Sequence, residues 1–326
     1  FFPKWATEMS RSKTFYEQPV NSIDVLFIGT STYMRSFSPL NLWNDFGFTS
    51  YNRASSVQLP MVTYYYLLES LKYQKPKVVV IDPRWLFFDF NIDKYESWLR
   101  FSIDTMKFSN EKAQLINDVV KKSEKQTIIS YYFPLFRFHS RWNELKSWDF
   151  NRGTYTRYDY LRGYLPLSTT CDCNRLENQM EPTQEIAELN EDAIYYFNKM
   201  IELCKAQGID LVFATTPKLA SWDYSKYLAM KEYALEKQVY YIDYNLSELF
   251  DLVNLDPQSD FYDPTHLNIN GANKVSEHFG KYLVSNFKLA NKINNPEYHQ
   301  WDEDLVHLNS VNMSDNQEDP EKLLIK

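Results

Sequence analysis

Residues 24–31 read Asp-Val-Leu-Phe-Ile-Gly-Thr-Ser and decide the fold. Val25 to Ile28 are consecutive apolar residues, a pattern typical of a short strand that is buried on both faces of a parallel sheet. The run stops at Gly29, and the hydroxyl side chains of Thr30 and Ser31 follow directly. We therefore expect a buried strand with Ser31 just beyond its carboxyl end.

Similar apolar runs recur along the chain between segments with helical periodicity. Helices that alternate with short buried strands indicate a parallel sheet covered on both faces, with right-handed crossovers. The sequence thus predicts an α/β fold: a three-layer α/β/α sandwich around a mostly parallel five-stranded sheet, as in flavodoxin. Ligands of such sheets bind at the carboxyl ends of the strands. The expected strands are 24–28, 49–51, 77–81, 210–214 and 239–242, and the clearest helices are 61–71 and 185–206.

The length suits a single α/β domain, which we expect to span residues 1–326. Residues 83–182 interrupt the pattern with aromatic and arginine clusters such as FPLFRFHSRW, and they are expected to form an insertion or cap. This segment is either an outer layer that packs its aromatic side chains on the sheet or a substrate-binding lid. The acidic stretch 301–326 is expected to be a loosely packed tail.

The composition excludes some partners. A formal net charge of -8 leaves no basic surplus to replace the counterions of DNA or RNA, so we expect no nucleic-acid partner. No apolar run approaches the ~20 residues that cross a bilayer. The chain opens with FFPKW and not with Met, which we interpret as the exit from a removed membrane helix or signal anchor. This predicts an extracellular or cell-surface protein that is membrane-anchored in its full-length form.

The cysteines do not indicate a metal centre. Cys171 and Cys173 form a C-x-C pair, which has neither the spacing nor the partners of a zinc site, and we expect no disulfide framework. Cys204 lies in a helical pattern and is expected to be a buried, inert thiol. The sequence also lacks H-x-x-x-H, G-x-G-x-x-G and G-x-x-x-x-G-K-[ST] motifs. Neither a metal nor another cofactor is therefore expected.

Two segments carry chemistry. Ser31 after the first strand is either a nucleophile or a helix cap, and the segment alone does not decide between them. Asp263 stands three residues before His266, a spacing that sets the carboxylate against Nδ1 of the imidazole and leaves Nε2 to accept a serine proton. The alternative is a turn in which Asp263 caps and His266 merely packs. A helix that begins near Asn270 is expected to hold this loop against the sheet. The remaining histidines, His139, His278, His299 and His307, lack such a setting.

These segments resemble the SGNH, or GDSL-like, serine hydrolases, which have Gly-x-Ser after the first strand and Asp-x-x-His before the last helix. FIGTSTYMRSFSPLNLW, SYNRASSVQLP, PKVVVID and DPTHLNINGANK are similar to the branch found beside membrane-bound O-acyltransferases, and distantly to the D-alanyl transfer protein of teichoic acid synthesis. The resemblance implies Ser31 as nucleophile, His266 as general base and Asp263 as the residue that orients it. It also implies a membrane-bound O-acyltransferase as partner.

The remaining family blocks depart from this pattern. The second block here is Asn52-Arg53-Ala54-Ser55-Ser56-Val57-Gln58, and Ile81-Asp82-Pro83-Arg84 replaces the Gly-x-Asn-Asp that supplies an oxyanion donor in the family. An oxyanion hole needs donors rather than a fixed residue type. Gln58, Asn52 and Ser56 are therefore the candidate oxyanion or substrate-binding residues. The alternative for Gln58 is a polar side chain satisfied within its loop.

Together these features predict a serine-dependent acyl ester hydrolase or O-acyltransferase that acts on O-acyl groups of cell-surface glycans. An acylated carbohydrate or polyol is the expected substrate, and the family resemblance alone points to the glycan. The alternative is a non-catalytic module with the same fold, which binds glycan or docks on an acyltransferase.

Overall fold

The fold is an α/β sandwich built on a parallel sheet. The structure is a computed structural model that describes residues 14–133 and 160–314. Five strands form the sheet in the order β2-β1-β3-β4-β5, and every neighbouring pair is parallel. This confirms the predicted fold class. The strands are β1 (Val25–Ile28), β2 (Ser50–Asn52), β3 (Val78–Ile81), β4 (Asp210–Thr215) and β5 (Tyr240–Asp243).

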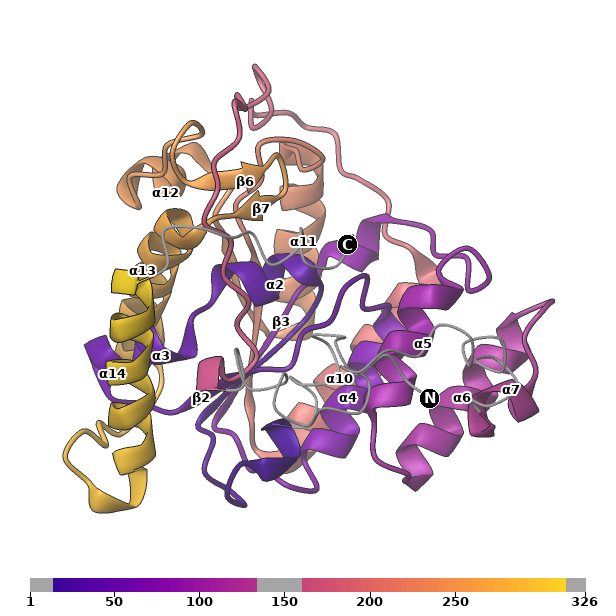
Figure 1. The fold of residues 1–326 in the computed structure, drawn as a ribbon. Helices are drawn as coiled ribbons and strands as arrows, with labels where there is room; N and C mark the ends of the chain where they lie inside the picture. The colour runs from indigo at the N-terminus through magenta and orange to yellow at the C-terminus, as the bar shows by residue number, and fades with distance from the viewer. Residues whose placement is uncertain (1–13, 134–159, 315–326) are drawn as a thin grey trace.

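Helices cover both faces of the sheet, and a small antiparallel hairpin of β6 and β7 lies next to α2 at one end of it (Figure 1). Among the described residues, no helix has both the length and the apolar character to cross a membrane. The elements outside the sheet are α2 (Ser31–Ser36), α3 (Pro39–Phe46), α4 (Pro60–Ser70), η1 (Arg84–Phe87), α5 (Glu96–Thr105), α6 (Asn110–Lys122), α7 (Ile128–Tyr132), α10 (Glu191–Gln207), α11 (Tyr224–Lys237), α12 (Ser247–Leu252), β6 (Phe261–Asp263), β7 (His266–Leu267), α13 (Ile269–Asn286), η4 (Pro296–Tyr298) and α14 (His299–Ser314).

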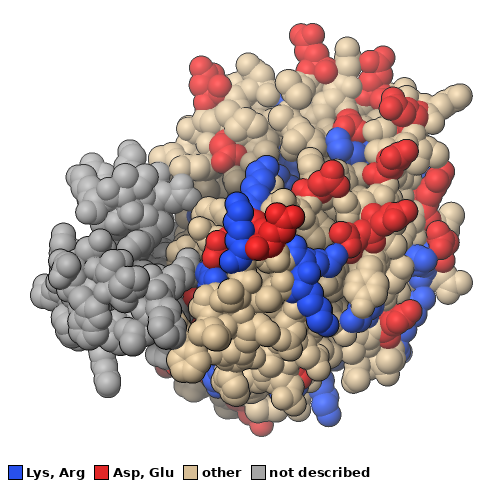
Figure 2. Space-filling model, turned by 90° about the vertical axis from the view of Figure 1, so that its right-hand side faces the viewer, with Lys and Arg blue, Asp and Glu red and all other residues tan. Residues whose placement is uncertain are grey.

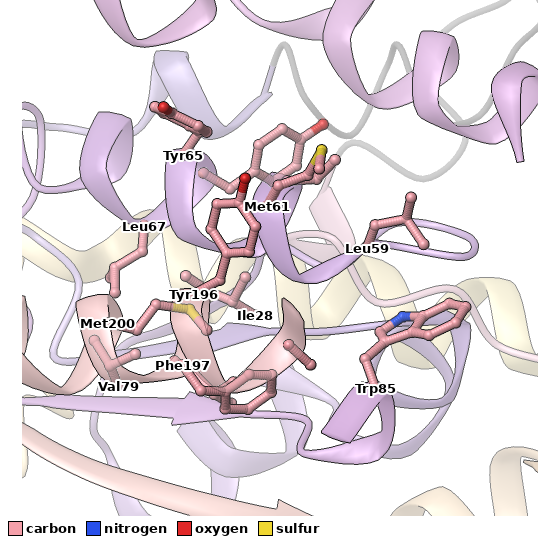
Figure 3. Packing of buried hydrophobic residues seen from close by; sticks show 14 of the residues in the cluster. Ile28, Leu59, Met61, Tyr65, Leu67, Val79, Trp85, Tyr196, Phe197 and Met200 are labelled. Atoms are coloured by element: carbon pink, nitrogen blue, oxygen red, sulfur yellow. The ribbon is translucent and has the colours of Figure 1, made fainter. Parts of the chain in front are cut away.

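Strands β1 and β3 are apolar at every position because both of their faces are buried. Successive side chains of a strand point to opposite faces, so Leu26 and Ile28 join one hydrophobic cluster while Val25 and Phe27 join another. The first cluster contains side chains of α4, α10 and α11, and Figure 3 shows part of it around Ile28. The second contains side chains of α2, α3 and α13. Burial on two sides fixes the sheet between two helical layers.

Part of the expected insertion, residues 83–182, forms an added helical layer. Helices α5 and α6 pack against α4, and α7 packs against α6. Leu115, Ile116 and Val119 of α6 are fully buried in the first cluster. The face that carries α5, α6 and α7, on the right of Figure 1, has acidic and basic side chains interspersed (Figure 2). Residues 134–159 of the expected insertion lie outside the described ranges.

The C-terminal region differs from the loosely packed tail that was expected at 301–326. Residues up to Ser314 form α14, which packs on α3. Trp301 is buried, with its ring centroid 5.3 Å from that of Trp43. Two of the acidic residues have structural partners: Asp302 accepts a hydrogen bond from the Trp43 indole, and Asp304 forms an ion pair with Arg162. Residues 315–326 of the tail lie outside the described ranges.

The cysteines also differ in part from expectation. Cys171 and Cys173 are joined by a disulfide, with their Cα atoms 5.2 Å apart. The bend that brings them together is stabilised by the Cys171 N–H, which donates to the Phe261 carbonyl oxygen. Cys204 is a buried free thiol in α10, as predicted, and burial raises the pKa of this thiol to about 12.

A buried ion pair joins the end of β2 to α4. Arg53 Nη2 lies 2.9 Å from Glu69 Oε2, and both side chains are almost fully buried. The Tyr16 hydroxyl donates to the same carboxylate oxygen, and the guanidinium carbon lies 4.0 Å from the centroid of the Phe15 ring. Each charge is therefore matched inside the core, and the loss of one leaves the other buried and uncompensated.

Replacement of Glu69 by Leu should destabilise the protein by about 3–5 kcal/mol, because Arg53 would keep its buried charge without a partner. Urea unfolding followed by tryptophan fluorescence measures the change. Lys72→Ala is the control, since it removes a pair with Glu111 in which the Lys72 side chain is 46% exposed. That variant should lose no more than about 1 kcal/mol. Equal losses of unfolding free energy in the two variants would contradict the stabilising role of the buried Arg53–Glu69 pair.

Candidate active site

Ser31 is the first residue of α2, directly beyond the carboxyl end of β1. The helix cap is Thr30, and its side chain makes no capping hydrogen bond. The Ser31 hydroxyl instead lies 2.7 Å from Nε2 of His266. The two residues are separated by 235 positions in the sequence, so only the fold brings them together. The structure thus places Ser31 against the predicted base and not in a capping role.

Asp263 and His266 lie on the β6–β7 hairpin and face each other across its turn. Asp263 Oδ2 lies 2.7 Å from His266 Nδ1. The other carboxylate oxygen accepts hydrogen bonds from the backbone N–H groups of Thr265 and His266. This network assigns the imidazole proton to Nδ1 and leaves Nε2 as the acceptor for the Ser31 hydroxyl. Ser31, His266 and Asp263 therefore form a continuous hydrogen-bonded chain.

The Asp263 carboxylate is held in its charged form. Burial opposes ionisation, but the hydrogen bond and charge of His266, with the bonds from Thr265, outweigh it and lower the pKa of Asp263 to about 2. The carboxylate is consequently ionised throughout the pH range in which proteins work, so it can orient the imidazole and stabilise its protonated form.

The hairpin is fixed by its neighbours. Asn268 caps α13, accepting from the N–H groups of Asn270 and Gly271, and its side chain donates to the Ser259 carbonyl. Leu219 N–H donates to the Pro264 carbonyl inside the turn. The helix expected near Asn270 is α13, which buries Val275, Phe279 and Leu283 in the second hydrophobic cluster. His266 is therefore held in place by a well-packed helix.

Asp82, just beyond β3, holds the turn that carries Ser31. Its Oδ2 accepts hydrogen bonds from the Thr30 N–H, the Thr30 hydroxyl and the Thr32 hydroxyl. A Cβ on Gly29 would lie 2.5 Å from the Asp82 Cβ, so only glycine allows this approach. In the sequence, Asp82 stood out only as a departure from a family block, and no role was predicted for it. The signal that could have identified it is a carboxylate directly after a buried strand.

The expected oxyanion donors are used elsewhere, which corrects the prediction for Asn52 and Gln58. Asn52 Nδ2 donates to the carbonyl oxygens of Tyr33 and Phe37. Gln58 Nε2 donates to the Arg53 carbonyl and the Ser55 hydroxyl. Both side chains are buried, and both N–H groups of each amide are engaged. These amides hold the backbone around the site; Gln58 is the satisfied polar side chain of the alternative interpretation.

Ser56, the third candidate, is half-buried in the connection between β2 and α4. The backbone offers another source of donors, because the first N–H groups of a helix have no acceptor within it. In α2 these are the N–H groups of Ser31 and Thr32, next to the Ser31 hydroxyl, since the Tyr33 N–H donates to the Thr30 carbonyl. An oxyanion that forms at Ser31 would lie close to these groups.

Comparison with known proteins adds little. No protein-family model matches the chain, and no curated protein matches it. A crystal structure of a Bacteroides fragilis protein described as a putative acylhydrolase is similar over 84% of this chain and 94% of that one. The sequence identity is 14% and the TM-score 0.36. A likeness at this level says nothing about the activity of this chain.

Replacement of Gly29 by Ala should displace the turn between β1 and α2, since the new Cβ would overlap Asp82 and Tyr33. We expect a loss of about 1–3 kcal/mol in stability and slower reaction of Ser31 with a fluorophosphonate. Gly208→Ala is the control. No atom lies within 4 Å of the Cβ that this substitution adds, so any loss of stability comes from the positive φ of 66° alone. Unchanged Ser31 reactivity in a destabilised Gly29→Ala protein would contradict this role of Gly29.

The lowered pKa of Asp263 predicts a pH dependence of stability. Because the pKa of Asp263 is about 2 in the folded state and its ordinary value is 3.8, this group stabilises the protein above pH 3.8. The contribution is lost as the pH falls through this interval to about 2. Asp263→Asn should therefore flatten the fall of the free energy of unfolding over that interval, measured by urea titrations at each pH. An unaltered acid slope would argue against the lowered pKa.

Proposed function

We propose that this protein is a serine-dependent acyl ester hydrolase or O-acyltransferase. The observation that carries the proposal is the chain from Ser31 through His266 to Asp263, with 2.7 Å at each step. A nucleophile, a base and a carboxylate that orients the base are the parts that acyl transfer requires. They lie at the carboxyl end of the parallel sheet, where such folds bind ligands.

In the proposed reaction Ser31 Oγ attacks the ester carbonyl carbon while His266 Nε2 accepts the hydroxyl proton. The tetrahedral intermediate collapses, the bond to the alcohol oxygen breaks, and His266 returns the proton to the departing alcohol. An acyl-serine remains. Water or an acceptor hydroxyl then attacks it, again losing its proton to His266, and Ser31 regains that proton as it leaves. Asp263 stabilises the imidazolium in both halves.

The proposed substrates are O-acyl groups on cell-surface glycans or polyols, and the support is the motif resemblance of the sequence. Aromatic side chains offer flat faces suited to sugar rings, and the segment 83–182 contains Trp85, Trp98, Trp142 and Trp148. Trp85 is buried in the core, whereas Trp98 is 43% exposed. Trp142 and Trp148 lie outside the described residues. An extracellular, membrane-anchored location and a membrane-bound O-acyltransferase partner belong to the same proposal. The Cys171–Cys173 disulfide supports the location, since disulfides persist in oxidising compartments.

A second candidate is a non-catalytic module that binds glycan or docks on an acyltransferase. The observation that favours it is the engagement of the Asn52 and Gln58 amides with backbone and hydroxyl oxygens. Loss of one oxyanion donor typically lowers the rate by about 10²–10³. The two candidates therefore differ in the reactivity of Ser31 and not in the fold.

A fluorophosphonate probe should label wild-type protein at Ser31, and short-chain aryl esters should be turned over. Ser31→Ala should abolish labelling, and Asp263→Asn should lower kcat by about 10³–10⁴ because the imidazole would lose the partner that fixes its tautomer. Peptide mapping of the labelled protein identifies the modified serine.

Ser55→Ala serves as the control, since Ser55 is a buried serine whose hydroxyl bonds to that of Ser102. It should keep the label on Ser31. Folded wild-type protein that neither takes the label nor turns over any acyl ester would refute the catalytic proposal. Retained glycan binding by that protein would then favour the module.

A further inference from the structure

We propose that Arg84 and Lys218 form an anion-binding subsite beside Ser31, which selects acyl esters that carry a carboxylate or phosphate group. The inference rests on the proposed function, because it names the substrate class of that site. The subsite lies at the carboxyl ends of β3 and β4, which are neighbouring parallel strands. Neither residue was singled out as a site residue from the sequence.

The Arg84 guanidinium has no partner among the described residues. Its backbone N–H donates to Asp82 Oδ1, which fixes the start of η1. The side chain is half-buried, and its contact is with the ring of Phe88, 5.5 Å from the guanidinium carbon. No hydrogen bond or ion pair joins this guanidinium to residues 14–133 or 160–314. A guanidinium has five N–H donors, and no described residue accepts a hydrogen bond from those of Arg84, so they can bind a ligand.

Lys218 is a buried cation that forms no ion pair with the described residues. Only 1% of the residue is exposed, and Nζ donates to the carbonyl and hydroxyl oxygens of Thr216. No carboxylate in the described part of the chain lies within ion-pair distance of it. Burial lowers the pKa of Lys218 to about 8; Asp82 and Asp243 oppose this effect, and the Arg84 charge adds to it. A buried ammonium of this kind is costly unless an anion compensates it.

The neighbouring carboxylates are occupied by neutral donors. Asp82 accepts from Thr30, from Thr32 and from the Arg84 backbone. Asp243 accepts from the Trp222 indole, the Tyr241 hydroxyl, and the Asn245 backbone and side chain. Both acids are therefore saturated without an ion pair to either cation. Their charges act on Lys218 from nearby, but no carboxylate in the described part of the chain forms an ion pair with Lys218 or Arg84.

Hydrogen bonds connect this edge to both halves of the reactive chain. Asp82 contacts Thr30 and Thr32, the residues on either side of Ser31. Leu219, next to Lys218, donates its N–H to Pro264 in the turn between Asp263 and His266. The backbone at Arg84 is thus linked through Asp82 to the turn that carries Ser31, and the residue after Lys218 is linked to the turn that carries His266. A substrate whose ester reaches Ser31 would bring its neighbouring groups to this place.

The chemistry of the two cations points to an oxyanion ligand. A guanidinium presents parallel N–H groups that match the oxygens of a carboxylate or phosphate. The half-buried Arg84 is the group that would touch the ligand, while the buried Lys218 adds a fixed positive charge behind it. In such a partly dry site the attraction is stronger than in water. A neutral ester would leave the Arg84 guanidinium without a hydrogen-bond or ion-pair partner in the described part of the chain.

The test measures binding with the Ser31→Ala protein, which cannot consume an ester through Ser31. Acetylglycerol, acetylglycerol phosphate and acetylglycerate are titrated calorimetrically; they share the ester and differ in charge and in the kind of oxyanion. We expect one or both anionic esters to bind about ten- to a hundredfold more tightly than acetylglycerol. Tighter binding of acetylglycerol phosphate identifies phosphate as the recognised group, and tighter binding of acetylglycerate identifies carboxylate.

Arg84→Gln in the same background should reduce this preference at least about tenfold, and Arg84→Lys should keep part of it because it retains the charge without the planar fork. Arg175→Gln is the matched control, since Arg175 is also half-buried but already donates to the Asn245 carbonyl. It should leave the preference intact.

Equal binding of the neutral and anionic esters, or an unchanged preference in Arg84→Gln, would overturn the subsite. The failure of the proposed function is recognised separately, through fluorophosphonate labelling of the protein that retains Ser31. Absent labelling together with an Arg84-dependent preference for anionic esters would leave the subsite standing in a protein without acyl transfer.

Discussion

The reactive arrangement depends on the hydrogen bonds that the Asp82 carboxylate accepts from Thr30 and Thr32. Strands β1 and β3 are parallel and in register at Ile28 and Ile81, so the residues that follow them emerge side by side. Gly29 lacks a Cβ, which lets Asp82 approach and accept hydrogen bonds from the Thr30 N–H and the Thr32 hydroxyl on either side of Ser31. Ser31 is therefore positioned by the sheet and not by a free loop. His266, which reaches the Ser31 hydroxyl, lies on a hairpin that α13 anchors.

The sequence predicted those features whose causes are local. Strands β1 and β3 are buried on both faces and apolar at every position, so they were visible as runs. The Asp263–His266 pair was visible because three residues of separation suffice to close the contact. The partners of Asn52 and Gln58 were not visible. A buried amide must satisfy its donors, but whether an oxyanion or a carbonyl does so depends on the tertiary path of the chain.

The same limit applies to charge and to the cysteines. A net charge of -8 describes the whole molecule, yet within the described residues Arg84 and Lys218 form no ion pair at one edge of the sheet, because the nearby acids bond to neutral donors. Acidic residues suggested a loose tail at 301–326, whereas Asp302 and Asp304 stabilise the packing of α14. Cys171 and Cys173 pair through a backbone bend supported by Phe261, which the spacing does not reveal.

Solvent access decides whether an acyl-serine here would pass to water or to another hydroxyl. The side chains of His266 and Asp263 are 22% and 36% exposed, so water can reach the base in the isolated chain. Transfer to a glycan hydroxyl requires that water be excluded while the acyl-enzyme persists. That exclusion must come from a bound acceptor or from a partner that covers the hairpin. In the proposed reaction this exposure of His266 favours hydrolysis by the isolated chain, and acyl transfer would need a complex that covers His266.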